Sequence, residues 1–188
     1  MKNPASLLPG NMGTIVIPKI CQHNGPQVDY EGELAVIIGE DCKDVKSIND
    51  ALKYVSHYAV ANDVSARWWQ LKGSGGQFCR GKSFDTFCPL SVPTPASSVR
   101  DPQDLSIITR VNGQIMQNGH TSQMIFSVAR IIQELSQGMR LQAGTIILTG
   151  TPAGVGDARK PPVYLKHGDK VEVEIPGVGL LLNDVVEE

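Results

Sequence analysis

Hydrophobic and polar residues alternate along several stretches of the chain, which is the pattern of β-strands. Residues 28–40, VDYEGELAVIIGE, are the most informative of these stretches. Successive side chains of a strand point to opposite faces, so Glu31 and Glu33 lie on the same face. Both faces of the later half are apolar. The pattern therefore predicts a buried strand that begins with two neighbouring carboxylates, which are costly near a core unless their charge is compensated.

Other segments predict further strands, several of them joined in pairs. Residues 105–119 contain Asn112-Gly113, a strong signal for a β-hairpin. Residues 169–186 predict a strand, a Pro-Gly turn and a second strand. Single strands are expected over three further ranges, the last of them buried: 14–18, 57–63 and 144–150.

Two segments have the period of an α-helix. In residues 47–55, Ser47 and Asp50 resemble a capping box. Residues 121–138 give the clearest helix, which Gly138 would end. The apolar stripe expected on this second helix consists of Met124, Ile125, Val128, Ala129, Ile132 and Leu135.

Strands outnumber helices and pair largely through hairpins. The Gly-rich residues 71–83 are expected to be a loop, and the Pro- and Ser-rich residues 89–104 a surface connection. A length of 188 residues favours one domain. Together these features indicate an α+β fold dominated by a curled or sandwiched sheet.

Composition and charge narrow the function classes. Hydrophobic residues make up 41% and charged residues 19% of the chain, as in ordinary globular proteins. A net charge of −2 gives no electrostatic reason to expect nucleic acid or an anionic membrane as a partner. No apolar run approaches the roughly 20 residues of a membrane span. The first residues show no apolar segment of signal-peptide length either.

The four cysteines and four histidines are scattered, with neither C-x-x-C nor H-x-x-x-H spacing. We therefore expect reduced thiols, and no zinc site built from cysteine and histidine. Carboxylates offer a different site. Asp63 ends an apolar strand, and with Glu31 and Glu33 it would supply three hard oxygen ligands, which suit Mg²⁺. The alternative is that the glutamates mark a solvated strand end and that the aspartate terminates a strand.

Cations and a glycine-rich segment accompany these carboxylates. Arg67 and Lys82 could hold an anionic substrate beside the metal, although any single lysine or arginine is usually a surface residue. Residues 149–156, TGTPAGVG, could offer backbone N–H groups and the Thr151 hydroxyl to an anion, or form an ordinary turn. They lack the G-x-G-x-x-G pattern at a helix start, so a dinucleotide is not expected.

Six segments, taken in order, resemble the motifs of the fumarylacetoacetate hydrolase family. They are DYEGELAVIIG, ANDVSARWWQ, GKSFDTFCPL, RVNGQIMQNGHTSQMIF, GTIILTGTPAGVG and LKHGDKVEVEIPGVGLLLNDV. Six motifs in order, spanning nearly the whole chain, are far more specific than any one of them. The resemblance is to the smaller family members, which act on acylpyruvates and oxaloacetate.

The resemblance implies a mixed β-sandwich roll with a few short helices, residues 1–188 forming one catalytic domain that dimerises with a second copy. It also implies a metal site and an active-site lysine. The implied ligands of Mg²⁺ or Mn²⁺ are Glu31, Glu33 and Asp63, and the lysine is Lys82. The residues implied to hold the carboxylate and oxo groups of a substrate are Arg67, Gln70 and Thr151.

Two departures from the family pattern are visible. Trp68 stands where the family usually has aspartate, and we expect it to alter packing without removing a metal ligand. Family members also normally carry an N-terminal segment with a histidine and a glutamate on a short lid helix, which activate water. No residue here matches that histidine. We therefore expect a lid-less domain with an open metal cleft and poor hydrolysis of acylpyruvates.

The implied function is that of a Mg²⁺-dependent enzyme acting on a small 2-oxo or 1,3-dicarbonyl acid through a metal-stabilised enolate. C–C bond hydrolysis, decarboxylation and tautomerisation all use such an enolate. Lys82 would stabilise the developing charge or move a proton. The alternative is a degenerate member that serves as a metal- or small-molecule-binding scaffold or as an interaction subunit. The expected compartment is the cytoplasm, with the mitochondrial matrix as the alternative.

Overall fold

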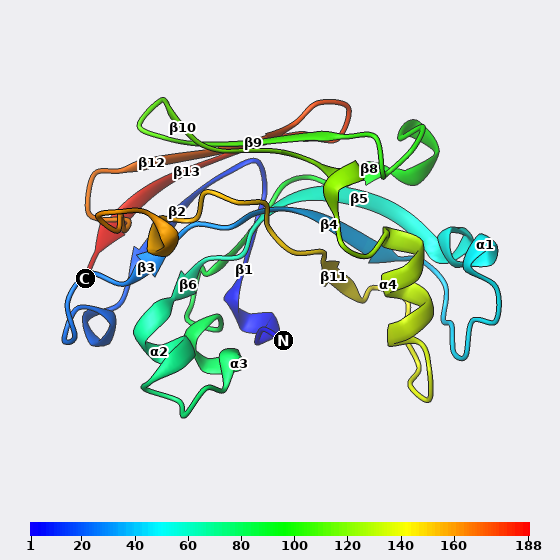
Figure 1. Ribbon diagram of the computed structural model, residues 1–188, viewed down its shortest axis with the longest axis horizontal. Coiled ribbons are helices and arrows are strands. Elements are labelled where there is room, and N and C mark those ends of the chain that lie inside the picture. The colour runs from blue at the N-terminus through cyan, green and yellow to red at the C-terminus, as the bar shows by residue number, and fades with distance from the viewer.

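The computed structural model describes residues 1–188, in which two β-sheets lie one above the other (Figure 1). The first sheet has six strands. In spatial order they are β1 (Leu7–Pro9), β7 (Cys88–Leu90), β5 (Val55–Asn62), β4 (Gly32–Ile38) and β11 (Ile146–Leu148), and β8 (Thr94–Pro95) pairs with β5. The second sheet has five strands. Their order is β10 (Gln114–His120), β9 (Ser106–Val111), β12 (Lys170–Ile175), β13 (Gly179–Glu187) and β2 (Met12–Ile17).

A third, two-stranded sheet and several short helices complete the fold. The short sheet pairs β3 (Val28–Asp29) with β6 (Ser65–Ala66). The helices are α1 (Ile48–Ala51), α2 (Arg67–Leu71), α3 (Phe78–Gly81) and α4 (Val128–Leu135). The 3₁₀ turns are η1 (Pro4–Ser6), η2 (Lys19–Cys21), η3 (Leu52–Tyr54), η4 (Ala96–Ser98), η5 (Thr121–Gln123) and η6 (Gly156–Ala158). Figure 1 shows α2 and α3 near the N-terminus of the chain, away from α1 and α4.

One hydrophobic core joins the two main sheets. It comprises 33 buried residues from both sheets and from the helices, turns and loops that connect them. Strand β4 lies inside the first sheet between β5 and β11, and nearly all of its residues are buried. The buried strand expected over residues 28–40 is thereby confirmed, and so is the α+β fold with a sandwiched sheet. A strand that is covered on both faces has no polar side, which explains its continuous apolar run.

Both predicted strand pairs are present. Strands β9 and β10 form the hairpin around Asn112-Gly113, whose φ angles of 52° and 80° suit the tight turn of a hairpin. Strands β12 and β13 pair across the Pro-Gly turn. The single strands expected near residues 14–18 and 57–63 correspond to β2 and β5.

The helix predicted over residues 121–138 is wrong in its first half. Helix α4 begins only at Val128, where the Ser127 side chain accepts a hydrogen bond from the Arg130 N–H and caps it. Residues 121–123 form the turn η5, which ends at Met124. Ile125, which the sequence placed on the apolar stripe, is 91% exposed.

Four other predictions need smaller corrections. The expected loop 71–83 contains α3, which Gln77 caps through its side chain. The expected surface connection 89–104 contributes to β7 and β8, which pair with the first sheet, so part of it is structural. Strand β11 is an edge strand with one partner, and only Ile147 is buried in it. Helix α1 covers only the first half of residues 47–55.

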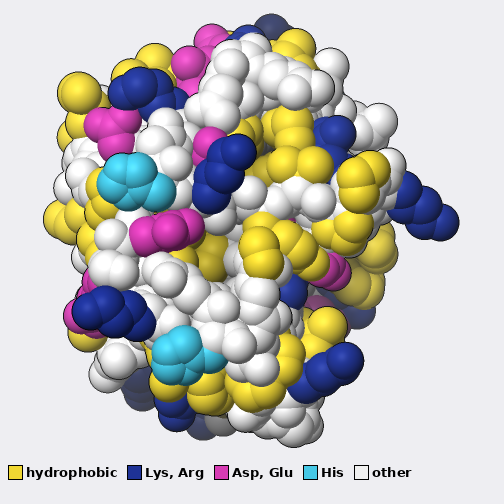
Figure 2. All heavy atoms as spheres, turned by 90° about the vertical axis from the view of Figure 1, so that its left-hand side faces the viewer, with side chains coloured by type: hydrophobic (Ala, Val, Ile, Leu, Met, Phe, Trp, Pro, Cys, Tyr) yellow, Lys and Arg dark blue, Asp and Glu magenta, His cyan; other side chains and the backbone are white.

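No helix of the structure is both long enough and apolar enough to cross a membrane. Figure 2 shows acidic and basic side chains interspersed among apolar ones on the face at the left of Figure 1. This distribution agrees with the small net charge of the sequence.

Gly32 lies where the two sheets approach each other closely. A Cβ atom at this position would lie 2.1 Å from Thr109 Oγ1 and 3.0 Å from Val173 Cγ1, both on the facing sheet. Its N–H donates to Gln117 Oε1 at 3.0 Å. Any larger residue at position 32 would therefore push the sheets apart next to Glu31 and Glu33.

Substitution of Gly32 by alanine should lower the free energy of unfolding by roughly 1–3 kcal/mol, the usual cost of overpacking a core. Urea denaturation measures this change. Gly179→Ala is the matched control, because the nearest atoms to a Cβ there lie at 3.6 Å or more. Equal stability of the two variants would contradict the close approach.

Candidate metal and substrate site

Three carboxylates meet at one end of the β4–β5 pair. Glu31 precedes β4, Glu33 lies in it, and Asp63 directly follows β5. Antiparallel pairing continues past the strand ends, because the Asp63 N–H donates to the Glu31 carbonyl at 2.8 Å. One ligand atom from each side chain lies within 4.8 Å of the others, and all three residues are buried. The structure thus brings together the three carboxylates that the sequence singled out.

Two lysines bind these carboxylates. Lys82, at the C-terminal end of α3, donates to Glu31 Oε2 at 2.8 Å and also pairs with Asp63 Oδ2. Lys2 donates to Asp63 Oδ1 at 2.5 Å and to the Val64 carbonyl at 3.1 Å. Both lysine side chains are about nine-tenths buried, with relative exposures of 11% and 10%. Lys82 therefore lies where the sequence placed it, and Lys2 is an addition.

Arg67, the first residue of α2, lies on the other side of Glu31. Its Nε and Nη2 donate to Asp29 Oδ2 at 3.0 and 2.8 Å. Its Nη1 lies 2.6 Å from Glu31 Oε1 and donates to Gln70 Oε1 at 2.9 Å. Arg67 and Gln70 are thus adjacent to the cluster, and the guanidinium binds protein groups with all three of its nitrogen atoms.

The glycine-rich segment after β11 covers the remaining side. The Gly150 N–H donates to Glu33 Oε2 at 2.7 Å, and the Thr151 hydroxyl donates to the Gly32 carbonyl at 2.9 Å. Gln117 Nε2 in turn donates to Thr151 Oγ1 at 2.7 Å. The side-chain oxygen of Gln117, Oε1, also accepts from the Gly32 N–H. This buried glutamine therefore fixes the backbone between the two glutamates.

The surroundings shift the pKa values of the cluster in opposite directions. Burial, reinforced by the charges of Asp63 and Glu31, raises the pKa of Glu33 to about 8. Burial also acts to raise the pKa of Asp63, but the two lysines outweigh it and lower that pKa. For Lys82, burial favours the neutral form, but the carboxylates outweigh it and raise the pKa. Glu33 is therefore the carboxylate that lacks a cationic partner.

The donor set fits a hard divalent cation. All three candidate ligands are carboxylates, which Mg²⁺ and Mn²⁺ prefer. Each carboxylate oxygen has two lone pairs, so those that accept one N–H bond retain acceptor capacity. The buried Glu33 carboxylate, repelled by its neighbours and paired with no cation, is the group that a bound cation would compensate most.

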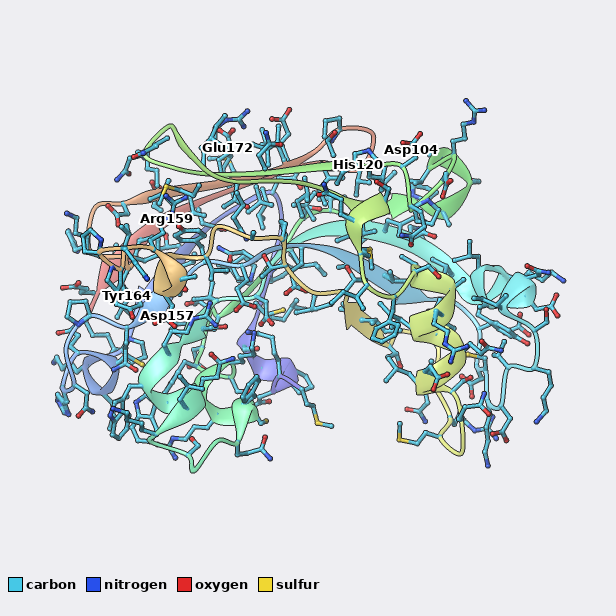
Figure 3. All side chains as sticks on the ribbon, in the orientation of Figure 1. Asp104, His120, Asp157, Arg159, Tyr164 and Glu172 are labelled. Carbon is cyan, nitrogen blue, oxygen red and sulfur yellow. The ribbon has the colours of Figure 1, made fainter.

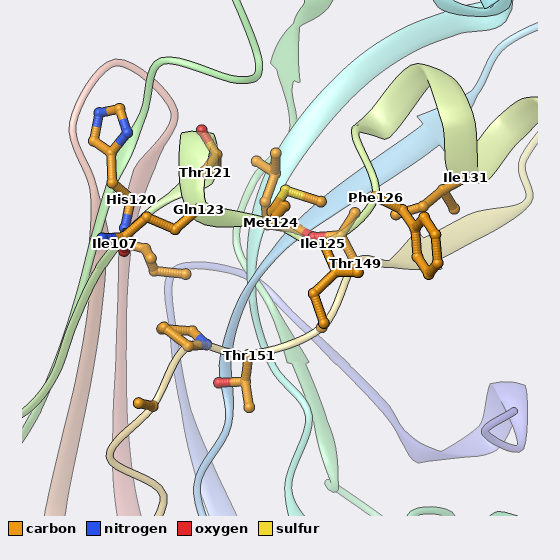
Figure 4. Close-up of a pocket in the computed structure, with 14 residues that line it drawn as sticks. Ile107, His120, Thr121, Gln123, Met124, Ile125, Phe126, Ile131, Thr149 and Thr151 are labelled. Atoms are coloured by element: carbon orange, nitrogen blue, oxygen red, sulfur yellow. The ribbon is translucent and has the colours of Figure 1, made fainter.

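Two pockets adjoin the cluster. A cavity of about 690 Å³ is reached by Lys2, Asp63 and Lys82, and its remaining wall is largely apolar. The apolar wall includes Phe78, Leu135, Leu141, Ile146 and Leu148. A second pocket of about 520 Å³ is lined by Gly150 and Thr151. Figure 4 shows Thr151 on one side of this second pocket and Met124 and Ile125 on the other. Volumes of this size suit small-molecule ligands.

Sequence reasoning missed three residues at this site: Lys2, Asp29 and Gln117. Asp29 was detectable, because it lies two residues before Glu31 and continues the same spacing. Lys2 and Gln117 reach the site from distant parts of the chain, and no local pattern identifies them. Trp68 packs edge-on against the ring of Trp69.

Comparisons with known proteins agree along the whole chain. The family model described as fumarylacetoacetate (FAA) hydrolase C-terminal matches residues 1–186. Oxaloacetate tautomerase FAHD2A, mitochondrial, from Bos taurus is 48% identical over 183 residues, which are 97% of this chain and 57% of that protein. The Homo sapiens protein of the same name is 46% identical with the same coverage. The chain thus spans somewhat more than half the length of these relatives.

Solved structures give the same result. A fumarylacetoacetate hydrolase from Exiguobacterium antarcticum is 43% identical, with a TM-score of 0.91 over 100% of this chain and 65% of the other. A 5-carboxymethyl-2-hydroxymuconate delta-isomerase from Mycobacterium smegmatis is 37% identical, with a TM-score of 0.85 over 98% and 66% of the two chains. The sandwiched sheet is therefore shared with enzymes of known structure.

Replacing Glu33 by glutamine should stabilise the metal-free protein at pH 8, by roughly 1–3 kcal/mol. The amide carries no charge for Asp63 and Glu31 to repel, and its oxygen can still accept from Gly150. The Glu33 pKa is raised from 4.5 to about 8, so the fold favours the protonated form. The wild-type free energy of unfolding should then fall as pH rises between these values, and E33Q should flatten that slope.

Urea denaturation in a chelating buffer from pH 5 to pH 9 measures both effects. The control is Glu31→Gln, which should destabilise the protein because Lys82 and Arg67 lose the charge of a buried partner. Loss of stability in both variants at pH 8 would show that Glu33 is compensated after all.

Proposed function

Because the chain belongs to the fumarylacetoacetate hydrolase family, we propose that residues 1–188 form the catalytic domain of a divalent-metal-dependent enzyme. Its substrates would be small 2-oxo acids, and its chemistry would pass through an enolate. Oxaloacetate is the first substrate to test, since the relatives cited above are named oxaloacetate tautomerases. Tautomerisation is accordingly the leading reaction, ahead of decarboxylation and C–C bond hydrolysis.

The charge balance of the buried site carries this proposal. Four carboxylates face three cations there: Asp29, Glu31, Glu33 and Asp63 against Lys2, Arg67 and Lys82. The ionised cluster therefore has one excess negative charge, and a divalent cation would convert it into one excess positive charge. The carboxylate next to the 2-oxo group of a substrate would neutralise that charge, so the site favours the cation and the anionic substrate together.

Glu31, Glu33 and Asp63 are the residues that would hold the cation. When bound, it would polarise the 2-oxo group of a substrate and stabilise negative charge on that oxygen. The chain itself supplies the remaining functions. Lys82 pairs with two of the proposed ligands and, like Asp63, lines the 690 Å³ cavity. Its raised pKa keeps it protonated, so it can donate to a developing oxyanion.

Arg67, Gln70 and Thr151 are proposed to orient the substrate. The Gln70 side-chain oxygen accepts from Arg67, and this hydrogen bond fixes the orientation of the amide. Its NH₂ group then remains as a donor for a substrate. Thr151 lines the second pocket, and its hydroxyl donates to the carbonyl of Gly32, the residue between Glu31 and Glu33. The apolar wall formed by residues such as Ile146 and Leu148 would exclude water from the substrate side.

The homodimer expected from the family resemblance stays a prediction. For the compartment, we favour the mitochondrial matrix over the cytoplasm, because the most similar relatives cited here are named mitochondrial. Fluorescence microscopy of the full-length gene product, tagged at its C-terminus, tests this choice.

The proposed activity should appear as Mg²⁺- or Mn²⁺-dependent interconversion of keto and enol oxaloacetate, followed by ultraviolet absorbance of the enol. A chelator should abolish it, and added metal should restore it. Acylpyruvates and decarboxylation are assayed in parallel on the same protein. A protein that binds Mg²⁺ in calorimetry but converts none of these substrates would be the scaffold of the alternative interpretation.

Replacing Lys82 by methionine should separate binding from chemistry. Removal of its charge leaves Glu31 and Asp63 less neutralised, so Mg²⁺ affinity should stay unchanged or rise. The rate should fall about 10²–10³-fold, the usual cost of losing one oxyanion donor. Calorimetry and steady-state kinetics measure the two quantities. Lys72→Met, at an exposed lysine beyond α2, is the control and should match the wild type. A K82M enzyme with full activity would remove Lys82 from the mechanism.

A further inference from the structure

We propose that Asp29 is a positioning residue that fixes the Arg67 guanidinium between Glu31 and Gln70 and thereby sets the cation affinity of the carboxylate cluster. This inference rests on the proposed function and adds a residue to it. Asp29 touches neither the candidate ligands nor the two pockets described above. It would act only through the groups that it holds.

The carboxylate of Asp29 is fully buried, and both of its oxygens accept hydrogen bonds. Its relative exposure is 0%. Its oxygens accept five N–H groups, from Arg67 Nε and Nη2 at 3.0 and 2.8 Å and from the backbones of Tyr30, Gly156 and Asp157 at 2.8, 2.7 and 2.9 Å. A buried charge with this many donors is held in one position. Three segments therefore meet at one side chain: the end of β3, the start of α2 and the start of η6.

The shape of the arginine side chain transmits this position to the site. A guanidinium is planar, so fixing Nε and Nη2 on one carboxylate also fixes the direction of Nη1. That nitrogen lies 2.6 Å from Glu31 Oε1 and 2.9 Å from Gln70 Oε1. One proposed metal ligand and one proposed substrate-binding residue thus depend on how Asp29 holds Arg67.

Asp29 also anchors the loop that covers Glu33. Its Oδ1 receives the Gly156 N–H, and a Cβ on Gly156 would lie 2.8 Å from that oxygen and 1.8 Å from the Val163 carbonyl. Figure 3 shows Asp157 and Tyr164 side by side next to this point, where their side chains are hydrogen-bonded. The same loop carries Gly150, whose N–H binds Glu33, and Thr151.

Charge gives the direction of the effect. Asp29 shares the positive charge of Arg67 with Glu31, so that Glu31 is only partly neutralised and can still attract a cation. Without the Asp29 charge, the site gains one unit of positive charge and Arg67 is free to move onto Glu31. Both changes weaken cation binding. Groups that orient ligands in this way typically contribute 10–100-fold to metal affinity.

Asp29→Asn is the sharpest test, because asparagine keeps the size and one acceptor oxygen but presents an NH₂ group to donors. Its single oxygen can replace Oδ2, which accepts from Arg67 and the Asp157 N–H, or Oδ1, which accepts from the Tyr30 and Gly156 N–H groups, but not both. The matched control is Asp169→Asn. Asp169 is also a buried aspartate that binds a loop, accepting from Asn112 Nδ2 at 2.9 Å and from the Lys166 N–H at 3.0 Å, but it contacts no residue of the site.

Three measurements are made on wild type, D29N and D169N: the Mg²⁺ dissociation constant by calorimetry, the melting temperature, and KM and kcat on oxaloacetate. Both variants should lose stability. Only D29N should bind Mg²⁺ about 10–100-fold more weakly. Its KM for the substrate should rise at saturating Mg²⁺, since Gln70 is no longer oriented.

An unchanged Mg²⁺ affinity in D29N would overturn the inference and leave Asp29 a structural residue, with the proposed function intact. Absence of Mg²⁺ binding by the wild type would overturn the proposed function, and this inference with it. If D29N does not fold, Arg67→Lys tests the same link, because lysine lacks the planar fork that binds Asp29 through Nε and Nη2 and Glu31 through Nη1. R67K with wild-type Mg²⁺ affinity would then reject the proposal.

Discussion

The buried ion-pair network around Glu31 and Asp63 is the interaction on which the rest of the site depends. Charges of one sign cannot be gathered inside a protein without compensation, and here Lys82 joins the two carboxylates while Lys2 and Arg67 bind them from the outside. Ion pairs hold the site together, but Glu33 has no cationic partner. A bound metal ion would supply the missing positive charge.

The fold places this network through a few backbone contacts. Antiparallel pairing of β4 with β5 sets Asp63 opposite Glu31, and Gly32 between the glutamates lets the second sheet approach closely. Gln117, on that second sheet, binds both the Gly32 N–H and the Thr151 hydroxyl. The second sheet thus helps to form the site, because its Gln117 side chain positions the Gly32 peptide between the two proposed ligands.

The sequence predicted those parts of this arrangement that local patterns encode. A period of two placed Glu31 and Glu33 on one face, and the hairpin at Asn112-Gly113 followed from turn chemistry. Tertiary context decided the rest. The non-helical segment before Ser127 breaks an apolar periodicity that looked helical, and Ile125 is exposed there. The contact between Lys2 and Asp63 spans 61 positions of the chain, and no spacing rule could have found it.

The central claim is that the three carboxylates form one divalent-cation site. Anomalous X-ray diffraction from crystals soaked in Mn²⁺ tests it most directly, because the signal locates the ion independently of any activity. The account predicts a single strong peak in contact with oxygen atoms of Glu31, Glu33 and Asp63, and no such peak in crystals of the Glu33→Gln variant. A wild-type crystal with no peak at these carboxylates, or with the ion bound elsewhere, would contradict it.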